Sequence, residues 1–305
     1  MCIIIMFNPM LYAKSCLDAI SVWAYKVLPL MFPFFIFTRL IVNLSEPKQN
    51  FMDKFFSKVY HAPIGSFSTF LLATMSGYPM GAKLICSKFE NNQINSVEAK
   101  KMLSFCSVSG PMFMLGTVGI AMLSSFKAGL IILISNIIAS LLNGLIYRGK
   151  TSKNETPIKT YRPSNNILSD SVYDSLISIL MVGSYIVLSF LIIDMLNNLK
   201  ITTFLTNLIC SVFNLLNRHD VVYSILNGTL EITRGILDLS KTSAPLISKT
   251  IIASTLIGFG GVSIMLQSIG FLSKLKIPVK TMFVQKLTQA MLCLIVTTFA
   301  CLIFL

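Results

Sequence analysis

Long apolar runs separated by short polar stretches dominate the pattern along the chain. A transmembrane α-helix needs about 20 consecutive, mostly apolar residues. The pattern therefore predicts an all-α polytopic membrane protein with roughly eight membrane segments. One short run, 202–216, is expected to be a re-entrant or interfacial piece. The apolar runs lie near residues 2–12, 18–44, 64–86, 102–125, 128–147, 174–196, 202–216, 221–239, 250–272 and 287–305.

Four of these runs contain glycine, proline or charged residues where a spanning helix normally carries leucine. The first contains "SGYPMGAK" and the second contains "SGP". The third contains "LEITRGILD" and the fourth contains "GFGG". Non-helical backbone at membrane depth is tolerated only where it is buried in protein or lines a water-filled cavity. We therefore expect four broken or re-entrant helices that face the protein interior.

The four broken segments fall into two matching pairs. Aligning Gly81 on Gly235 pairs the first segment with the third, and aligning Gly110 on Gly261 pairs the second with the fourth. Corresponding breaks in two halves are the best sequence pointer to a transporter's midplane site. The chain is thus predicted to have two structurally related halves, an inverted repeat, joined by a polar loop. The expected units are a first membrane repeat at 1–148, a basic loop at 149–166 and a second membrane repeat at 167–305.

Composition and charge support a membrane protein and argue against nucleic acid as a partner. The chain is 54% hydrophobic and 12% charged, whereas soluble domains average about 25% charged residues. The formal net charge is +13, and the Lys and Arg residues cluster in loops, where they orient the chain and contact anionic lipid. The basic loops at 148–162 and 274–286 are both expected to be cytoplasmic. The apolar N-terminus lacks a basic start and a cleavage site, which favours a retained segment over a signal peptide.

The sequence contains no motif that would support an enzyme, a metal site or a cofactor site. It has neither H-E-x-x-H nor G-x-S-x-G, and it has only two histidines. The glycine cluster "GFGGVSIMLQ" lacks the full G-x-G-x-x-G pattern and a preceding strand. The seven cysteines show no metal-ligand spacing and are expected to be small buried apolar residues.

The segment "SGYPMGAK" supplies the first group of candidate binding residues. Pro79 removes a backbone donor, while Gly77 and Gly81 permit non-helical backbone and close approach. Freed N–H groups at the start of a half-helix can hold an anion. The alternative is a proline kink with glycines for close helix packing. Lys83 could face an anionic substrate or, alternatively, extend to the membrane edge.

The segment "NGTLEITRGILDL" supplies the second group. If it is helical, Asn227, Glu231, Arg234 and Asp238 form one polar stripe. Ionisable residues inside a membrane segment are expensive and usually functional. The alternative is a Glu231–Arg234 pair that only holds helices together. Gln267 could donate to a substrate carboxylate or bridge two helices.

These segments together resemble the YlbJ-type sporulation integral membrane proteins with nucleoside-recognition Gate domains. The resemblance rests on "LPLMFPFF", "SGYPMGAK", "EAKKMLSFCSVSGPMFMLGTVG", "LEITRG" and "GFGGVSIMLQ", in the family's order over most of the chain. It implies a fold like that of concentrative nucleoside transporters. It also implies movement of dipicolinic acid across the outer forespore membrane, from mother cell to forespore. The N-terminal segment is shorter than is typical of the family, which affects the helix count.

The resulting expectation is a membrane transporter of a small anion, with dipicolinic acid as the substrate. The alternatives are a transporter of nucleosides or another small metabolite, and a membrane scaffold or gate subunit without a substrate. The expected partners are a dicarboxylate or nucleoside-like small molecule and the lipid bilayer, and a homo-oligomer is left open. The candidate binding residues are Ser76, Gly77, Pro79, Gly81, Lys83, Ser109, Gly110, Asn227, Glu231, Arg234, Gly260, Gly261 and Gln267.

Overall fold

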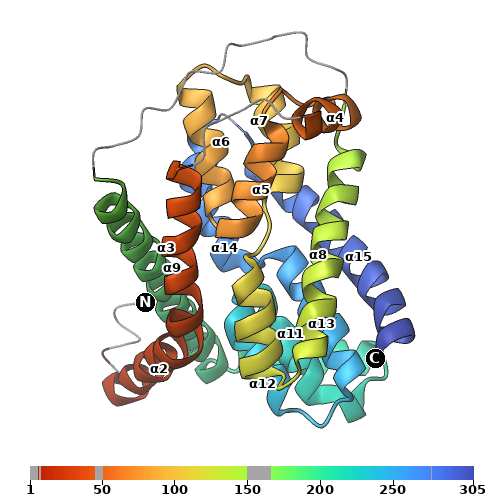
Figure 1. Ribbon diagram of the computed structural model, residues 1–305. Helices are drawn as coiled ribbons and strands as arrows, with labels where there is room; N and C mark the ends of the chain where they lie inside the picture. The colour runs from red at the N-terminus through yellow and green to blue at the C-terminus, as the bar shows by residue number, and fades with distance from the viewer. Residues whose placement is uncertain (1–5, 7, 45–50, 150–165, 276) are drawn as a thin grey trace.

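The computed structural model describes residues 6, 8–44, 51–149, 166–275 and 277–305. All regular elements within these ranges are helical (Figure 1). In the first half the elements are α2 (Pro9–Val22), η1 (Trp23–Val27), α3 (Leu28–Leu44), α4 (Phe51–Tyr60), α5 (Ser66–Ser76), α6 (Met80–Glu90), α7 (Ser96–Cys106), η2 (Phe113–Met122) and α8 (Phe126–Ile146). In the second half they are α9 (Ile167–Asn198), α10 (Ile201–Val212), η3 (Leu216–Arg218), α11 (His219–Leu230), α12 (Ile232–Lys241), α13 (Leu246–Phe259), α14 (Gly261–Lys274) and α15 (Val279–Phe304).

Five helices in the described ranges are long and apolar enough to cross a membrane, fewer than the eight expected. They are Pro9–Ile41, Phe126–Ile146, Ile167–Asn198, Leu246–Gly270 and Val279–Phe304. The difference arises because several apolar runs fold as shorter helices that pair around a break. The run at 202–216, expected to be a re-entrant or interfacial piece, forms the 12-residue helix α10. The expected loop 149–166 lies almost wholly outside the described residues.

The two halves present the same order of elements. Each has a long apolar helix, a short helix, a pair of short helices around a break, a broken helix and a final long helix. The first pair is α5 with α6, and the second is α11 with α12. Within the first pair, the start of α5 at Gly65 lies near the end of α6 at Lys88, so the two helices are antiparallel. Figure 1 shows the two pairs towards opposite ends of the bundle.

The helix ends that flank the two basic connections lie at one end of the bundle. These are the ends of α8 and α14 and the starts of α9 and α15. The carbonyl of Gly149, just after α8, accepts a hydrogen bond from His61 Nδ1 at 2.7 Å. Leu275, just after α14, accepts a hydrogen bond from Ser96 at the start of α7. Figure 1 shows α9 and α15 starting at this same end. The described residues that flank the two basic connections therefore lie at one end of the bundle.

Side-chain caps define where two helices, α7 and α8, begin. Asn95 and Glu98 form a reciprocal capping box at the start of α7, with N–H to oxygen distances of 2.8 and 2.9 Å. Ser125 caps α8 through the Ala128 N–H. Such caps satisfy the free N–H groups that a helix start leaves in an apolar environment. The elements next to the breaks thus start at fixed residues.

The long helices present apolar side chains to their surroundings. On α15, Phe299, Leu302 and Ile303 are 65%, 74% and 71% exposed. The same helix buries Gln285 and Gln289, so its polar residues face inwards. This distribution, with apolar residues outside and polar residues inside, is expected of a helix that faces lipid. Hydrocarbon does not drive apolar side chains into the protein interior.

Candidate functional site: four helix breaks and two polar clusters

The first break, Gly77 to Pro79, separates α5 from α6. Gly77 has a left-handed φ of 69°, and the Tyr78–Pro79 peptide bond is cis. A Cβ at Gly77 would lie 2.6 Å from the Gly110 nitrogen, and one at Gly81 would lie 2.0 Å from the Cys106 carbonyl oxygen. These glycines therefore allow the first break to touch the second. The structure thus gives Gly77 and Gly81 the close-packing role that the sequence left as an alternative.

The second break, Ser107 to Gly110, separates α7 from η2. Ser109 is buried and Gly110 packs against the backbone of Gly77. α7 ends at Cys106, so its last carbonyl groups lack partners within the helix. One carbonyl of the break, that of Ser107, accepts a hydrogen bond from Lys286.

The third and fourth breaks are single residues that also meet. Glu231 separates α11 from α12, and Gly260, with φ 87°, separates α13 from α14. A Cβ at Gly261 would lie 3.4 Å from the Leu230 carbonyl oxygen. Tyr78 connects the first break to the fourth, because its hydroxyl lies 3.4 Å from the Ile257 carbonyl. All four predicted breaks are therefore present, and they meet in the interior.

A cavity of about 90 Å³ opens beside the first break. Two cations line it, Lys83 from α6 and Arg39 from α3. Lys83 is exposed and, in the described ranges, has no hydrogen-bond or ion-pair partner. Arg39 donates to Asp174 at 2.6 Å and to Ser178 at 2.7 Å. The remaining lining residues are Phe35, Ser76, Tyr78, Pro79, Met80, Ile177, Ser178 and Met181.

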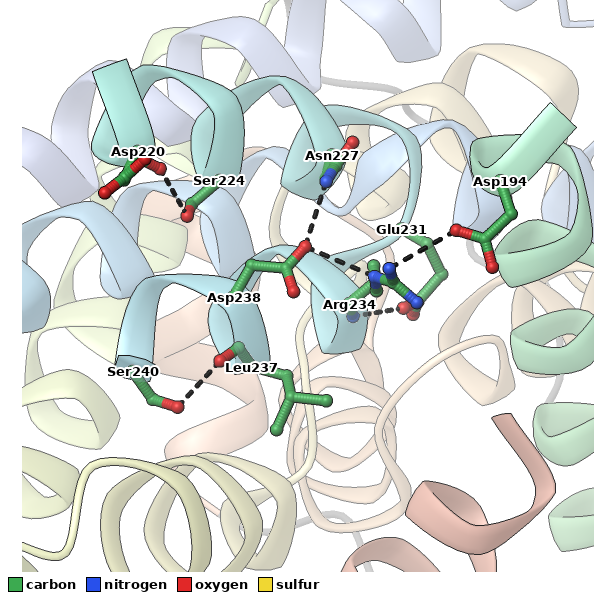
Figure 2. Close-up of polar contacts among 9 residues, drawn as sticks. All are labelled: Asp194, Asp220, Ser224, Asn227, Glu231, Arg234, Leu237, Asp238 and Ser240. Carbon is green, nitrogen blue, oxygen red and sulfur yellow. Dashed lines mark hydrogen bonds and ion pairs between the residues drawn. The ribbon is translucent and has the colours of Figure 1, made fainter. Parts of the chain in front are cut away.

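The predicted polar stripe forms a connected cluster on the α11–α12 pair (Figure 2). The Arg234 guanidinium lies 3.2 Å from Asp238 and 3.3 Å from Asp194 of α9. It also stacks over the Phe190 ring, 4.9 Å from its centroid. Asn227 donates to Asp238 at 2.9 Å. Arg234 is therefore neutralised by two carboxylates.

The Glu231–Arg234 side-chain pair, the alternative considered from the sequence, is replaced by other partners. Glu231 instead caps α12, accepting a hydrogen bond from the Arg234 backbone N–H at 2.7 Å. A residue at the start of a helix has its side chain directed at the free N–H groups. The Arg234 side chain points away to Asp194, which the sequence analysis did not select. The signal available in the sequence was that Asp194 is an acidic residue within the apolar run 174–196.

A second polar cluster, which the sequence analysis missed, surrounds Lys286. This lysine was assigned to the basic connection 274–286, but it lies in α15 and is only 2% exposed. Its Nζ donates to the Ser107 carbonyl at 2.5 Å, to Tyr78 Oη at 2.6 Å and to Gln289 Oε1 at 3.0 Å. α15 starts at Val279, eight residues before the start of the apolar run, so both Lys280 and Lys286 belong to the helix.

The predicted binding residues do not line one cavity. Ser76, Pro79 and Lys83 line the cavity beside the first break, whereas Asn227, Glu231 and Arg234 form the separate cluster on α11–α12. Gln267 is 9% exposed on α14. Arg39, a lone cation in the apolar run 18–44, joins Lys83 at the cavity and was not selected from the sequence.

Comparison with known proteins supports the resemblance found in the motifs. Neither a family model nor a solved structure matches the chain. The chain is 28% identical to the sporulation integral membrane protein YlbJ of Bacillus subtilis (strain 168) over 311 aligned residues. The alignment covers 92% of this chain and 76% of that protein. The resemblance to the YlbJ-type sporulation integral membrane proteins is thus confirmed over most of the chain, which is a multi-pass integral membrane protein.

Proposed function

We propose that the chain is a transporter of a small anionic metabolite, and that the anion is dipicolinate. The observation that carries the proposal is the cavity beside the first break, lined by Arg39 and Lys83. Cations at membrane depth are expensive and mark substrate or ion pathways. Dipicolinate is the substrate that the resemblance implies.

The chemistry of the cavity suits a flat molecule with two carboxylates. Arg39 uses two of its guanidinium nitrogens on Asp174 and Ser178, and an arginine has five N–H donors in all. Lys83 has three donors to offer. The walls include Phe35, which can contact the face of an aromatic ring. Two separated cations and an apolar wall match two carboxylates on one ring.

The cavity is smaller than ordinary small-molecule pockets, which measure about 300–1,000 Å³. We propose that it corresponds to a closed conformation. Its walls come from α3 and α9 on one side and from the α5–α6 pair on the other. We propose that these walls separate to admit the anion.

The order of elements supports a transport mechanism with two related halves. Each half contains an odd number of proposed crossings, namely two long helices and one broken helix. An odd number reverses the second half relative to the first, so the halves would form an inverted repeat like that of a nucleoside transporter. Both basic connections would then lie on one side, which the positive-inside rule makes cytoplasmic.

The sequence left Arg234 with either a functional role or a role in holding helices together, and its ion pairs support the second role. Because it is neutralised by Asp194 and Asp238, we assign Arg234 to holding the α11–α12 pair against α9. Glu231 caps α12. A scaffold without a substrate would also pair its polar groups in this way. Binding of an anion at Arg39 and Lys83 therefore decides between a transporter and a scaffold.

Calorimetric titration of the purified protein with dipicolinate tests the proposal. We expect saturable binding that weakens with ionic strength and that is about tenfold weaker in Lys83→Ala and in Arg39→Ala. Lys280→Ala, an exposed lysine on α15, is the matched control and should bind normally. Binding of a nucleoside that excludes dipicolinate would favour the nucleoside transporter. Absence of binding by the unaltered protein would favour the scaffold.

A further inference from the structure

The ammonium group of Lys286 occupies a site built entirely from uncharged oxygen atoms. Its three acceptors are the Ser107 carbonyl, the Tyr78 hydroxyl and the Gln289 amide oxygen. Within the described residues, no carboxylate lies at ion-pair distance from Lys286. The site lies between the first break, which contains Tyr78, and the second, which contains Ser107.

The hydrogen-bond directions match a charged ammonium group. Tyr78 donates its hydroxyl proton to the Ile257 carbonyl, so its lone pairs face Lys286. Three acceptors then meet the three N–H donors of an ammonium. The Tyr78 ring adds a cation–π contact, with its centroid 4.5 Å from Nζ. The C-terminal end of α7 adds the negative end of a helix dipole.

Gln289 shows that the surroundings are arranged around a cation. It turns its amide oxygen to Lys286, and among the described residues its buried Nε2 has no hydrogen-bond partner. An unsatisfied buried N–H group costs free energy. The orientation persists because the amide oxygen is the group that a cation needs.

We propose that Lys286 is a tethered cation that fills a monovalent-cation site between two helix breaks. Backbone carbonyls at unwound helices coordinate monovalent cations in membrane proteins, where they replace the hydration shell. Here a lysine on α15 delivers the positive charge to such a carbonyl. The unaltered protein therefore holds its first and second breaks together without a free metal cation.

Removing the amine exposes the oxygen ligands to a dissolved cation. Lys286→Ala leaves room and three oxygens, whereas Lys286→Met fills the same space with an apolar chain of similar length. We expect Na⁺ or K⁺ to stabilise Lys286→Ala and to have no specific effect on Lys286→Met or on the unaltered protein. Lys280→Ala, on the same helix but exposed, is the matched control.

Thermal unfolding in detergent tests this inference, with choline chloride replacing NaCl or KCl at constant ionic strength. At roughly 100 times the dissociation constant, the metal cation should raise the Tm of Lys286→Ala by on the order of 5 °C. Equal behaviour of Lys286→Ala and Lys286→Met would overturn the proposal. So would a specific cation requirement in the unaltered protein. The readout is stability, so it stands whether or not dipicolinate is the substrate.

A second measurement applies if Lys286→Ala does not fold. In the background of intact Lys286, Gln289→Leu removes one oxygen ligand and Tyr78→Phe removes another. Each should lower the Tm by several degrees in every salt, because the ammonium loses one of its acceptors. Unchanged Tm values in Gln289→Leu and Tyr78→Phe would show that the ammonium needs no such site.

Discussion

The guanidinium of Arg234 lies 3.3 Å from the carboxylate of Asp194, which joins the α11–α12 pair to the long helix α9. The two side chains are 19% and 22% exposed, so the ion pair is only partly screened by solvent. Asp238 holds the other side of the same guanidinium at 3.2 Å. This contact fixes the position of the third break relative to the first of the second half's long helices.

Replacing Asp194 by Asn should loosen the α11–α12 pair. A partly buried ion pair contributes more than a surface pair, so we expect a loss of about 1–3 kcal/mol in the free energy of unfolding. The measurement is thermal unfolding in detergent. Asp174→Asn, which removes an exposed partner of Arg39, is the control for a carboxylate on the same helix and should cost less.

A double-mutant cycle separates the ion pair from unrelated effects of substitution. Arg234→Gln and Asp194→Asn together should cost less than the sum of the single changes, because the pair is lost only once. Additive losses would show that Arg234 and Asp194 do not interact in the folded protein.

The carboxylate of Glu231 is predicted to act as a helix cap. Glu231→Ala removes the acceptor for the Arg234 N–H and should destabilise the protein by about 1–2 kcal/mol. Glu231→Gln keeps an acceptor oxygen and should lose about half as much. If both variants keep the Tm of the unaltered protein but lose transport equally, the carboxylate would act on a proton or substrate and not as a cap.

Two glycines on short helices should respond oppositely to an added methyl group. Gly81→Ala would place its Cβ 2.0 Å from the Cys106 carbonyl oxygen and should cost about 3 kcal/mol. Gly270→Ala has no atom within 4 Å of the new Cβ and should be neutral or stabilising by about 0.5–1 kcal/mol. Thermal unfolding compares them directly, and equal stability of the two variants would contradict the contact between the first and second breaks.

The sequence predicted the breaks well because glycine and proline act locally. Gly77, Pro79 and Gly260 interrupt helices where their backbone preferences require it. The spacing matched the first break with the third and the second with the fourth, whereas in space the first break contacts the second and the third contacts the fourth. Within the described residues five helices are long and apolar enough to span, fewer than the roughly eight membrane segments expected, because hydropathy alone does not separate a spanning helix from two short antiparallel helices around a turn.

Side-chain partners were harder to predict, because they depend on which helices pack together. The spacing offered Glu231 as an alternative partner of Arg234, yet its partner Asp194 is 40 residues away in the chain. Lys286 was assigned to a loop because charged residues surround it in sequence. Its acceptors Tyr78 and Ser107 come from the other half of the chain, and no local pattern indicates them.

Uptake of labelled dipicolinate into proteoliposomes tests the central claim most directly. We predict saturable uptake by the unaltered protein, about tenfold weaker apparent affinity in Lys83→Ala because one charge-assisted contact is lost, and normal uptake in Lys280→Ala. Recovery by Lys83→Arg would confirm that the charge at the cavity matters. Uptake that is the same in the unaltered protein, Lys83→Ala and Arg39→Ala, or no higher than in empty liposomes, would contradict the account.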